Sequence, residues 1–370
     1  MISTLQTPCR RTRKHQTRRG PIAVLTAFLM VPLIGMLAFS VDVGYLLKKR
    51  AELQRAADAA ALAAVRDLIP DANGDQDLDL VRATVRQYAA NNVTDVTDFV
   101  VLDSDITIGR FDPETVYTDF TILNDGIFDT VRVTLRRDAS ANGPIPLFFA
   151  GIFGILDSEV SASATAVLQK ASFLPPGAGV LPFSIPRDEW TKTELVDPPW
   201  SIYGDGRMED GSGASIPGNW GTLDLGSMSN STSDLNDQIL NGLHQTHLDE
   251  LHADTRIPHS RYIDGSVPFN ANADTGLSGG LKQSLNQIIG ERRYIPIFDS
   301  VSGSSGNNLE YQVTGWAVAN LHGVNFKGSN NSYVEIKKIS TFDGLLRPNP
   351  DLSVTEGVIE GAYTSPVLVE

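Results

Sequence analysis

The feature that most constrains this chain is an apolar run without a charged residue, from Pro21 to Val41. A helix rises ~1.5 Å per residue, so about 20 residues cross the hydrocarbon core of a bilayer. The run therefore predicts a single membrane span. The alternative is a cleaved signal peptide that ends at the small residues Ala38-Phe39-Ser40, although signal-peptide apolar regions usually hold only about 7–15 residues. Both interpretations export the chain that follows.

The charges on either side of the run predict its orientation. Six basic residues and no acidic residue precede it, whereas Lys48, Lys49 and Arg50 follow it closely. Positive charge favours the cytoplasmic side of a membrane. We therefore expect residues 1–19 to form a basic cytoplasmic tail and the large remainder to lie in the periplasm or at the cell surface.

The chain beyond the run is strongly acidic. The whole sequence has 30 Lys and Arg and 44 Asp and Glu residues. The first 50 residues hold nine of the basic and one of the acidic residues, which leaves 21 basic and 43 acidic residues, a net charge of −22, downstream. Such a surface repels nucleic acid, so we expect no nucleic-acid partner. The single cysteine, Cys9, precedes the run, so the downstream chain cannot hold an internal disulfide.

The helix is predicted to continue past the membrane to Ile69, because residues 45–69 are rich in helix formers, hold no Gly or Pro, and are followed by Pro70. Lys48 and Glu52 predict an i,i+4 ion pair on its solvated side. Small or apolar residues recur at helical spacing and predict a helix-packing face that could contact other helices. These residues are Leu53, Ala57, Ala60 and Ala64.

Asp42 stands directly after the apolar run. A carboxylate at this position is predicted to be solvated at the lipid–water boundary. The alternative is a buried partner for a cation on a neighbouring helix.

Four features of the first 66 residues carry a family resemblance: Arg-Arg-Gly at 18–20, the apolar run, Val-Asp-Val-Gly at 41–44, and LQRAADAAALAA at 53–64. The segment resembles the N-terminal part of TadE/TadG-like proteins of the Flp (tight adherence) pilus assembly system. FGILDSEVSASATAV at 153–167 extends the resemblance to about residue 170. The resemblance implies a bacterial, envelope-anchored, pilin-like or pilus-associated protein. No Glu closely follows Gly20, so prepilin-type processing is not implied.

The sequence as a whole predicts an α+β fold: a long N-terminal transmembrane helix, then a β-rich extracytoplasmic region with short helices. We expect a helix over Asp77–Asn91 and strands over Val100–Arg110, Thr115–Leu123, Asp129–Asp138 and Ser161–Val167. Further strands are expected at Gly179–Ile185, Tyr294–Phe298, Tyr311–Ala319 and Tyr333–Ile339, and helices at Ser233–Leu251 and Ser278–Ile289.

The chain is predicted to divide into a tail (1–19), a transmembrane and extended helix (20–69), an α+β Tad-like region (70–171) and a β-rich C-terminal domain of unknown role (180–370). The last boundary follows the SFLPPGAG segment at Ser172–Gly179. The apolar segment Pro146–Leu156 is too short for a second span, so we expect it in the core or lying at a surface.

Two groups of residues could hold a metal. His244, His247 and His252 are close in sequence, but they match no HExxH motif, so surface histidines are the favoured interpretation. Asp71, Asn73 and Asp75 match the first ligand positions of a calcium-binding loop. Gln76 replaces the Gly of that loop and Arg82 replaces its final Glu, so we favour an acidic turn that caps the next helix.

Ser278 lies in a formal GxSxG match. A catalytic Ser of this type directly follows a strand. The segment NANADT before Ser278 does not predict a strand, so we expect Ser278 to cap a helix. The four Trp residues (190, 200, 220 and 316) are expected to pack in the core or on the surface.

The apolar run predicts the membrane anchor, and the resemblance implies a non-enzymatic component of a Tad/Flp-like pilus assembly or envelope-adhesion apparatus. We expect it to need no cofactor, and to contact membrane lipid and other pilus, secretion-system or envelope proteins. The alternatives are an exported metal-dependent hydrolase that uses the His244, His247 and His252 cluster, and a tethered binding module unrelated to pili.

Overall fold

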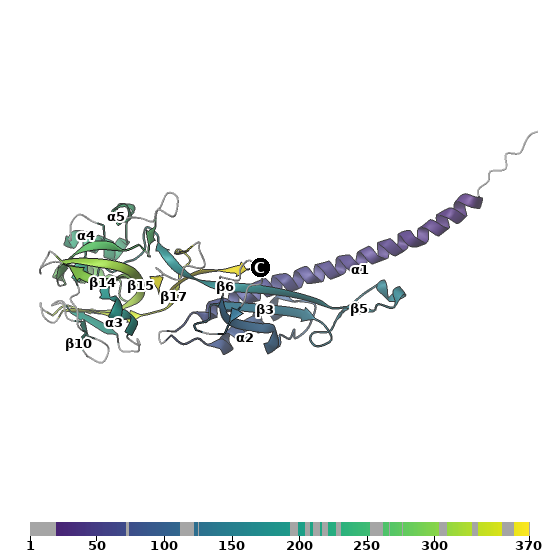
Figure 1. Ribbon diagram of the computed structural model, residues 1–370, viewed down its shortest axis with the longest axis horizontal. Coiled ribbons are helices and arrows are strands. Elements are labelled where there is room, and N and C mark those ends of the chain that lie inside the picture. The colour runs from purple at the N-terminus through teal and green to yellow at the C-terminus, as the bar shows by residue number, and fades with distance from the viewer. Residues whose placement is uncertain are drawn as a thin grey trace, which may run out of the picture. The chain divides into compact units, whose positions relative to one another are not determined.

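A computed structural model describes residues 20–71, 74–111, 122–124, 126–192, 199–203, 208–209, 215–216, 221–226, 231–251, 262–265, 267–275, 277–302, 309–327, 332–349 and 359–369 (Figure 1). The chain forms two compact units. The first contains Met1–Glu52 and Arg136–Ser161, and the second contains Leu53–Leu135 and Ala162–Glu370.

The long helix α1 extends from Gly20 to Ala64 and is followed by a 3₁₀ helix, η1, at Val65–Leu68. Pro32 lies inside α1. Ile69 leaves the helix with an extended backbone, φ −61° and ψ 118°, as expected for a residue that precedes a proline. The predicted continuous helix through the apolar run and beyond it is therefore confirmed.

The first unit holds a short hairpin besides the start of α1. Strands β4 (Ile145–Pro146) and β5 (Asp157–Ser158) pair antiparallel. The 3₁₀ helix η4 (Ala150–Phe153) lies between them and ends at Gly154, whose φ of +84° is in the region that favours glycine.

The second unit begins with the end of α1 and η1, and continues with α2 (Leu78–Asn92). The Asp77 carboxylate caps α2 and accepts the Leu80 N–H at 2.9 Å. An eight-stranded sheet follows, with the order β17-β20-β6-β3-β1-β2, and with β12 and β18 also paired to β6. Its strands are β1 (Ile106–Phe111), β2 (Ile122–Leu123), β3 (Thr130–Arg137), β6 (Val160–Leu174), β12 (Ile263–Asp264), β17 (Thr341–Phe342), β18 (Arg347–Pro348) and β20 (Ala362–Val369).

Strand β3 shows why this sheet has one core-facing side. Val131, Val133 and Leu135 are buried, whereas Arg132 and Thr134 between them are half-buried. Successive side chains of a strand point to opposite faces. The strand predicted over Asp129–Asp138 is therefore confirmed over Thr130–Arg137.

A ten-stranded sheet forms much of the rest of the second unit, with the order β10-β9-β8-β16-β15-β13-β11 and with β14, β7 and β19 joined to it. Its strands are β7 (Ile185–Pro186), β8 (Trp200–Tyr203), β9 (Met208–Glu209), β10 (Ser215–Ile216), β11 (Gly221–Leu223), β13 (Phe269–Thr275), β14 (Arg292–Ser302), β15 (Leu309–Asn325), β16 (Tyr333–Lys338) and β19 (Ile359–Glu360). The short helices of this part are α3 (Arg187–Lys192), α4 (Thr232–Asn241), α5 (Gln245–Glu250), η5 (Gly279–Leu281) and α6 (Lys282–Gln287).

The sequence predicted one helix at Ser233–Leu251, but the structure has two. Helix α4 stops at Gly242, which has φ +75° and whose N–H caps the Gln238 carbonyl. A side chain at Gly242 would meet the Ala178 carbonyl oxygen at 2.5 Å, so both the turn and the close approach require glycine.

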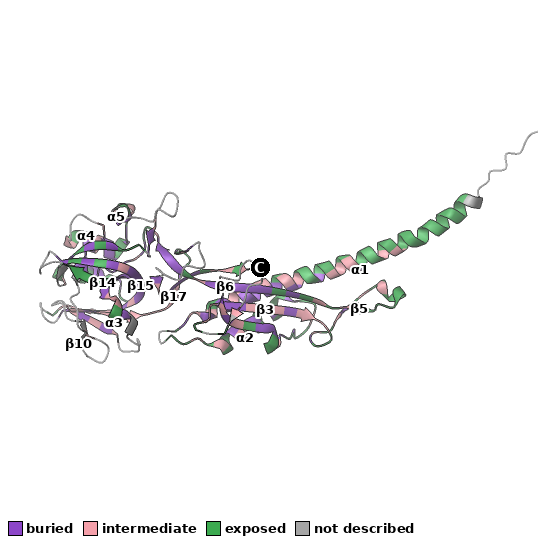
Figure 2. Cartoon of the chain, in the orientation of Figure 1, coloured by how far each residue is buried: buried purple, intermediate pink, exposed green. Residues whose placement is uncertain are grey.

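Figure 2 shows in purple the buried residues of the strands, and large aromatic residues of the second unit are among the buried ones. Trp190 and Trp200 pack edge to face with ring centroids 5.7 Å apart, and Trp316 is buried beside Phe269. Core packing is thus confirmed for these three tryptophans, and Trp220 lies outside the described residues. The predicted α+β class, with a long apolar helix followed by β-rich structure and short helices, is confirmed.

Candidate functional site

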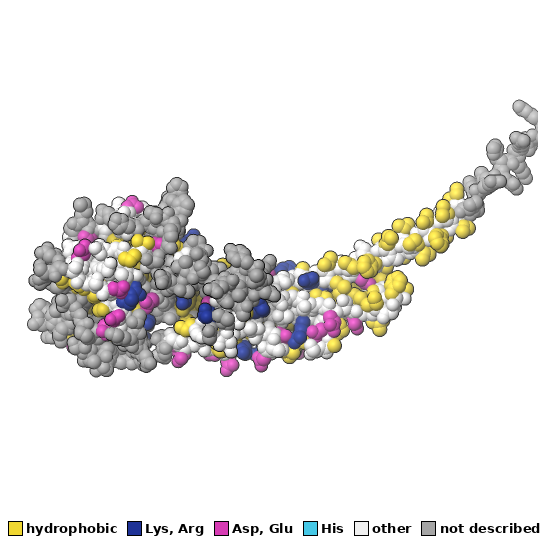
Figure 3. Space-filling model, in the orientation of Figure 1, with side chains coloured by type: hydrophobic (Ala, Val, Ile, Leu, Met, Phe, Trp, Pro, Cys, Tyr) yellow, Lys and Arg dark blue, Asp and Glu magenta, His cyan; other side chains and the backbone are white. Residues whose placement is uncertain are grey.

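The first half of α1 presents its apolar side chains to the outside. From Ile22 to Val41 the large hydrophobic side chains are exposed, and among the described residues this is the one helix that is long and apolar enough to cross a membrane. Figure 3 shows the yellow hydrophobic surface of this segment. A fully exposed hydrophobic segment of this length is not a core helix of a globular domain, and it matches what a bilayer requires.

The second half of α1 has the opposite character. The predicted packing face is buried within the chain: Leu53, Ala57, Ala60 and Ala64 are at most 2% exposed. Gln54 on the same segment donates a hydrogen bond to the Ser163 carbonyl of β6 at 2.9 Å. These alanines allow close approach within this chain, so their face is not open to lateral contact with another helix.

Asp42 marks the end of the exposed segment and is almost completely buried, with 3% of its surface exposed. Its carboxylate accepts backbone N–H groups from three consecutive residues. Phe148 donates to Oδ1 at 2.9 Å, and Phe149 and Ala150 donate to Oδ2 at 2.9 and 2.7 Å. The prediction of a solvated Asp42 is therefore wrong, and the partners that the described residues supply are backbone N–H groups of the same chain.

One turn further along α1, aromatic and charged side chains also contact one another. The rings of Tyr45 and Phe148 meet edge to face with centroids 5.2 Å apart. Lys49 lies over the Tyr45 ring at 5.8 Å and pairs with Glu52 at 3.0 Å. The predicted Lys48–Glu52 ion pair is therefore wrong. Glu52 pairs with Lys49, three residues before it, and Lys48 is exposed.

The histidine cluster is arranged by hydrogen bonds within the chain. His244 Nε2 lies 2.8 Å from Asp237 Oδ2, and His247 Nδ1 accepts the His244 backbone N–H at 3.0 Å. Hydrogen bonds from Asn241 and His244 hold the pKa of Asp237 below its usual range, against the opposing effect of desolvation. His252 lies outside the described residues, within which no group of His, Cys, Asp or Glu side chains is arranged to hold a metal.

The acidic segment before α2 forms a turn. Asp71 Oδ1 accepts the Asp75 N–H at 2.9 Å, and the Asp71 carbonyl accepts the Gly74 N–H at 3.1 Å. Asn73, the third candidate ligand, lies outside the described residues. With Asp77 as the helix cap, this local geometry agrees with the favoured interpretation of an acidic capping turn.

Ser278 caps a helix as predicted, because its Oγ accepts the Gly280 N–H at the start of η5. The accompanying statement that no strand precedes it is wrong, since β13 ends at Thr275. Ser278 Oγ also lies 3.2 Å from Thr232 Oγ1, so its polar neighbours are those of a structural cap.

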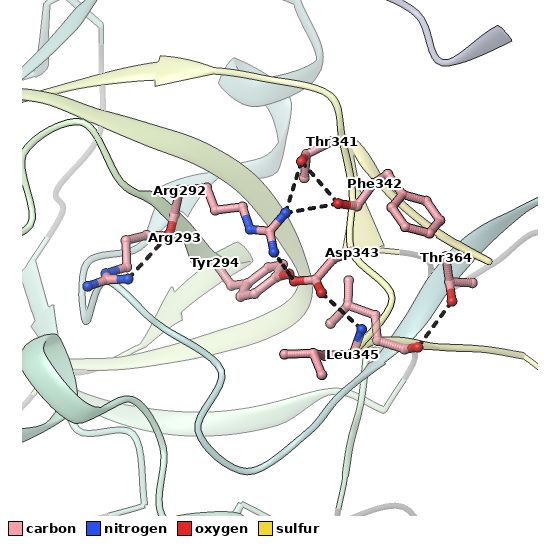
Figure 4. A network of polar contacts seen from close by, with 9 residues as sticks. Arg292, Arg293, Tyr294, Thr341, Phe342, Asp343, Leu345 and Thr364 are labelled. Carbon is pink, nitrogen blue, oxygen red and sulfur yellow. Dashed lines mark hydrogen bonds and ion pairs between the residues drawn. The ribbon is translucent and has the colours of Figure 1, made fainter. Parts of the chain in front are cut away.

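A polar network in the second unit, which the sequence did not reveal, is centred on the buried Asp343 (Figure 4). Its Oδ2 accepts the Tyr294 hydroxyl at 2.6 Å and pairs with Arg292 Nη2 at 2.8 Å, while Oδ1 accepts the Leu345 N–H at 3.0 Å. Burial and the hydrogen bond to Asp343 raise the pKa of Tyr294. Both carboxylate oxygens are occupied, so the network joins β14 to the segment after β17 as a structural contact. It borders a hollow of about 360 Å³.

Comparison with known families identifies the first part of the chain. Residues 20–67 match the TadE/G-like Flp pilus-assembly family, and residues 47–166 match a Tad-like Flp pilus-assembly family. These matches confirm the resemblance drawn from the apolar run and the motifs that follow it. No curated protein and no solved structure matches the chain.

Proposed function

We propose that this protein is a membrane-anchored, non-enzymatic component of a Tad/Flp-like pilus assembly or envelope-adhesion apparatus. The observation that carries the proposal is the coincidence of the family matches over residues 20–166 with an exposed apolar helix at their start. The remaining two hundred or so residues would act through contacts with other pilus, secretion-system or envelope proteins. The hydrolase and the tethered binding module stay alternatives.

The charge distribution supports one orientation. The basic tail before the span favours the cytoplasm, and the acidic chain after it would lie in the periplasm or at the surface. Within this proposal the four predicted parts have distinct tasks: tail, membrane helix, Tad-like region and a C-terminal region for partner contacts.

The orientation can be tested with the single native thiol. Cys9 lies in the tail, so a membrane-impermeant maleimide should label it only after the inner membrane has been permeabilised. A matched variant carries Cys9→Ser and Leu345→Cys, which places the thiol at an exposed position of the second unit. This variant should be labelled in spheroplasts with an intact inner membrane. The reverse pattern would contradict the proposed orientation.

The pilus role is tested by complementation. Cells that lack this chain should lose assembled pili, and the full chain should restore them. Leu33→Arg places a charge in the middle of the span, which costs about 2.5–3.5 kcal/mol on insertion scales, and should fail to restore pili. Normal pili in the deletion strain would contradict the proposal.

A further inference from the structure

The hairpin tip at Leu147–Leu156, here called the apolar loop, has an unusual surface. Ile152 is 81% exposed and Phe153 is 76% exposed. The other exposed large hydrophobic residues of the loop are Phe148, Phe149, Ile155 and Leu156. From Gly143 to Leu156 the chain has no charged residue. The loop is therefore at a surface and outside the core, and a contiguous apolar patch of this kind marks an interaction site.

The position of the loop relative to the membrane span is fixed by Asp42. The three N–H groups that bind its carboxylate belong to the start of the loop, and Asp42 follows the last residue of the exposed apolar run. One residue of helix is a rise of ~1.5 Å, so the loop starts at the level where the span leaves the hydrocarbon. Figure 1 shows the β4–β5 hairpin lying along α1, with its tip directed toward the N-terminal end of the helix.

The backbone of the loop suits a weakly hydrated environment. Besides the three N–H groups held by Asp42, Leu147 donates to the Leu156 carbonyl and Ile155 donates to the Ala150 carbonyl. Ile152 and Gly154 donate to the Phe149 and Gly151 carbonyls. An unpaired polar group is costly in lipid, and these internal bonds remove much of that cost.

Polar residues border the loop where a membrane surface would lie. Asp157 and Glu159 follow it, and Lys48 and Arg50 stand on the neighbouring part of α1. Tyr45, in ring contact with Phe148, is the type of residue enriched at membrane interfaces.

We propose that the apolar loop inserts into the leaflet at the C-terminal end of the span, beside α1, and that Asp42 sets its depth. The inference rests on the proposed membrane insertion of residues 21–41. The occupant is lipid, because the loop and the exposed half of α1 form a continuous apolar region that ends at one level. A second membrane contact beside the helix would resist tilting, which interfacial anchors control.

The test uses the full chain with Cys9→Ser and one new cysteine that carries an environment-sensitive fluorophore. The probe position is Ile152→Cys. Leu345→Cys, at a site that is 73% exposed in the second unit, is the matched exposed control, and Leu33→Cys reports the span itself. Each protein is placed at one copy per nanodisc of phosphatidylcholine and phosphatidylglycerol, and quenching by doxyl-labelled lipid and by aqueous iodide is measured.

We expect residue 152 to be quenched by shallow doxyl lipid and to be several-fold less accessible to iodide than residue 345. Quenching at 33 without quenching at 152 would overturn the loop proposal while the anchor stands. No lipid quenching at 33 would show that the anchor itself fails. Iodide access at 152 in nanodiscs, with protection in native membranes, would mean that another protein covers the loop, and this would overturn the assignment to lipid.

Discussion

Asp42 and Phe149 are 107 residues apart in the chain, yet the Phe149 N–H donates to Asp42 Oδ2 at 2.9 Å. This contact joins the end of the apolar helix to the apolar loop. It places the two most exposed hydrophobic segments of the first unit at one level.

Neutralising Asp42 should release the loop. In Asp42→Asn an amide NH2 group replaces one carboxylate oxygen, and this group cannot accept hydrogen bonds from the backbone N–H groups that it faces. We expect faster hydrogen exchange at residues 148–150 and greater iodide access at a labelled Ile152→Cys. Glu52→Gln is the control, because it removes a carboxylate from the same helix that pairs with Lys49. Unchanged exchange in Asp42→Asn would refute the role assigned to this residue.

Enlarging the buried alanine face should destabilise the second unit. Ala60 is fully buried, so Ala60→Leu forces extra methylene groups into a packed core, at a typical cost of about 1–3 kcal/mol. Ala27→Leu, in the exposed half of the same helix, should have almost no effect on the free energy of unfolding. Equal stability of the two variants in denaturant titrations would show that the face is not packed as described.

Breaking the Asp343 network should cost more than removing one of its donors. Asp343→Ala leaves the Tyr294 hydroxyl and the Leu345 N–H without their acceptor, whereas Arg292 keeps its Nη1 contacts with Thr341 and Phe342. The variant should lower the free energy of unfolding by about 2 kcal/mol. Tyr294→Phe removes one hydroxyl, while Asp343 keeps its other contacts, and should cost about 1 kcal/mol. Thermal and denaturant unfolding compare the two. A smaller loss in Asp343→Ala than in Tyr294→Phe would contradict the description.

Two aspartates should give stability profiles of opposite sign with pH. Burial raises the pKa of Asp129, against hydrogen bonds from Thr130 and Phe111. Its folded form therefore holds a proton at higher pH than its unfolded form. Its contribution to stability is greatest below the unfolded pKa and is lost as pH rises through the folded one.

The pKa of Asp138 is lowered by the Ser140 hydroxyl and by backbone N–H groups, so its contribution is lost as pH falls. Unfolding measured from acid to neutral pH should show wild type losing stability relative to Asp129→Asn as pH rises, and gaining it relative to Asp138→Asn. A pH-independent difference for either variant would contradict the assigned shift.

The histidine cluster should not retain zinc. His247 Nδ1 already accepts a backbone N–H, and His244 lies against Asp237. We expect metal analysis of the purified full chain to find no stoichiometric zinc, before or after incubation with zinc and removal of the excess. One bound zinc, lost in a His244→Ala and His247→Ala variant, would instead favour the hydrolase alternative.

The features predictable from the sequence were those with a strong local pattern. The charge-free run predicts the first part of α1. The alternation of Val131, Val133 and Leu135 with polar residues predicts β3. Strand β13 was missed because FNANADT consists largely of poor strand formers, and its pairing with β15 determines its conformation.

The contacts of Asp42 could not be predicted from the local sequence. No pattern around Asp42 indicates that its partners are 106 to 108 residues away. The run Pro146–Leu156, which contains the apolar loop, fitted a core segment as well as an exposed one, because an 11-residue hydrophobic run has the same composition in both. Only its tertiary position beside Asp42 separates the two.

The most direct test of the central claim is the location and N-terminal sequence of the mature protein. Cells are sheared, filaments are separated from membranes, and the N-terminus is sequenced in the fraction that holds the protein. An intact or Met-trimmed chain in the membrane is the result that a retained anchor predicts. A chain cut near Ser40 and found soluble, or one cut near Gly20 and found in filaments, would contradict the account of a membrane-anchored assembly component.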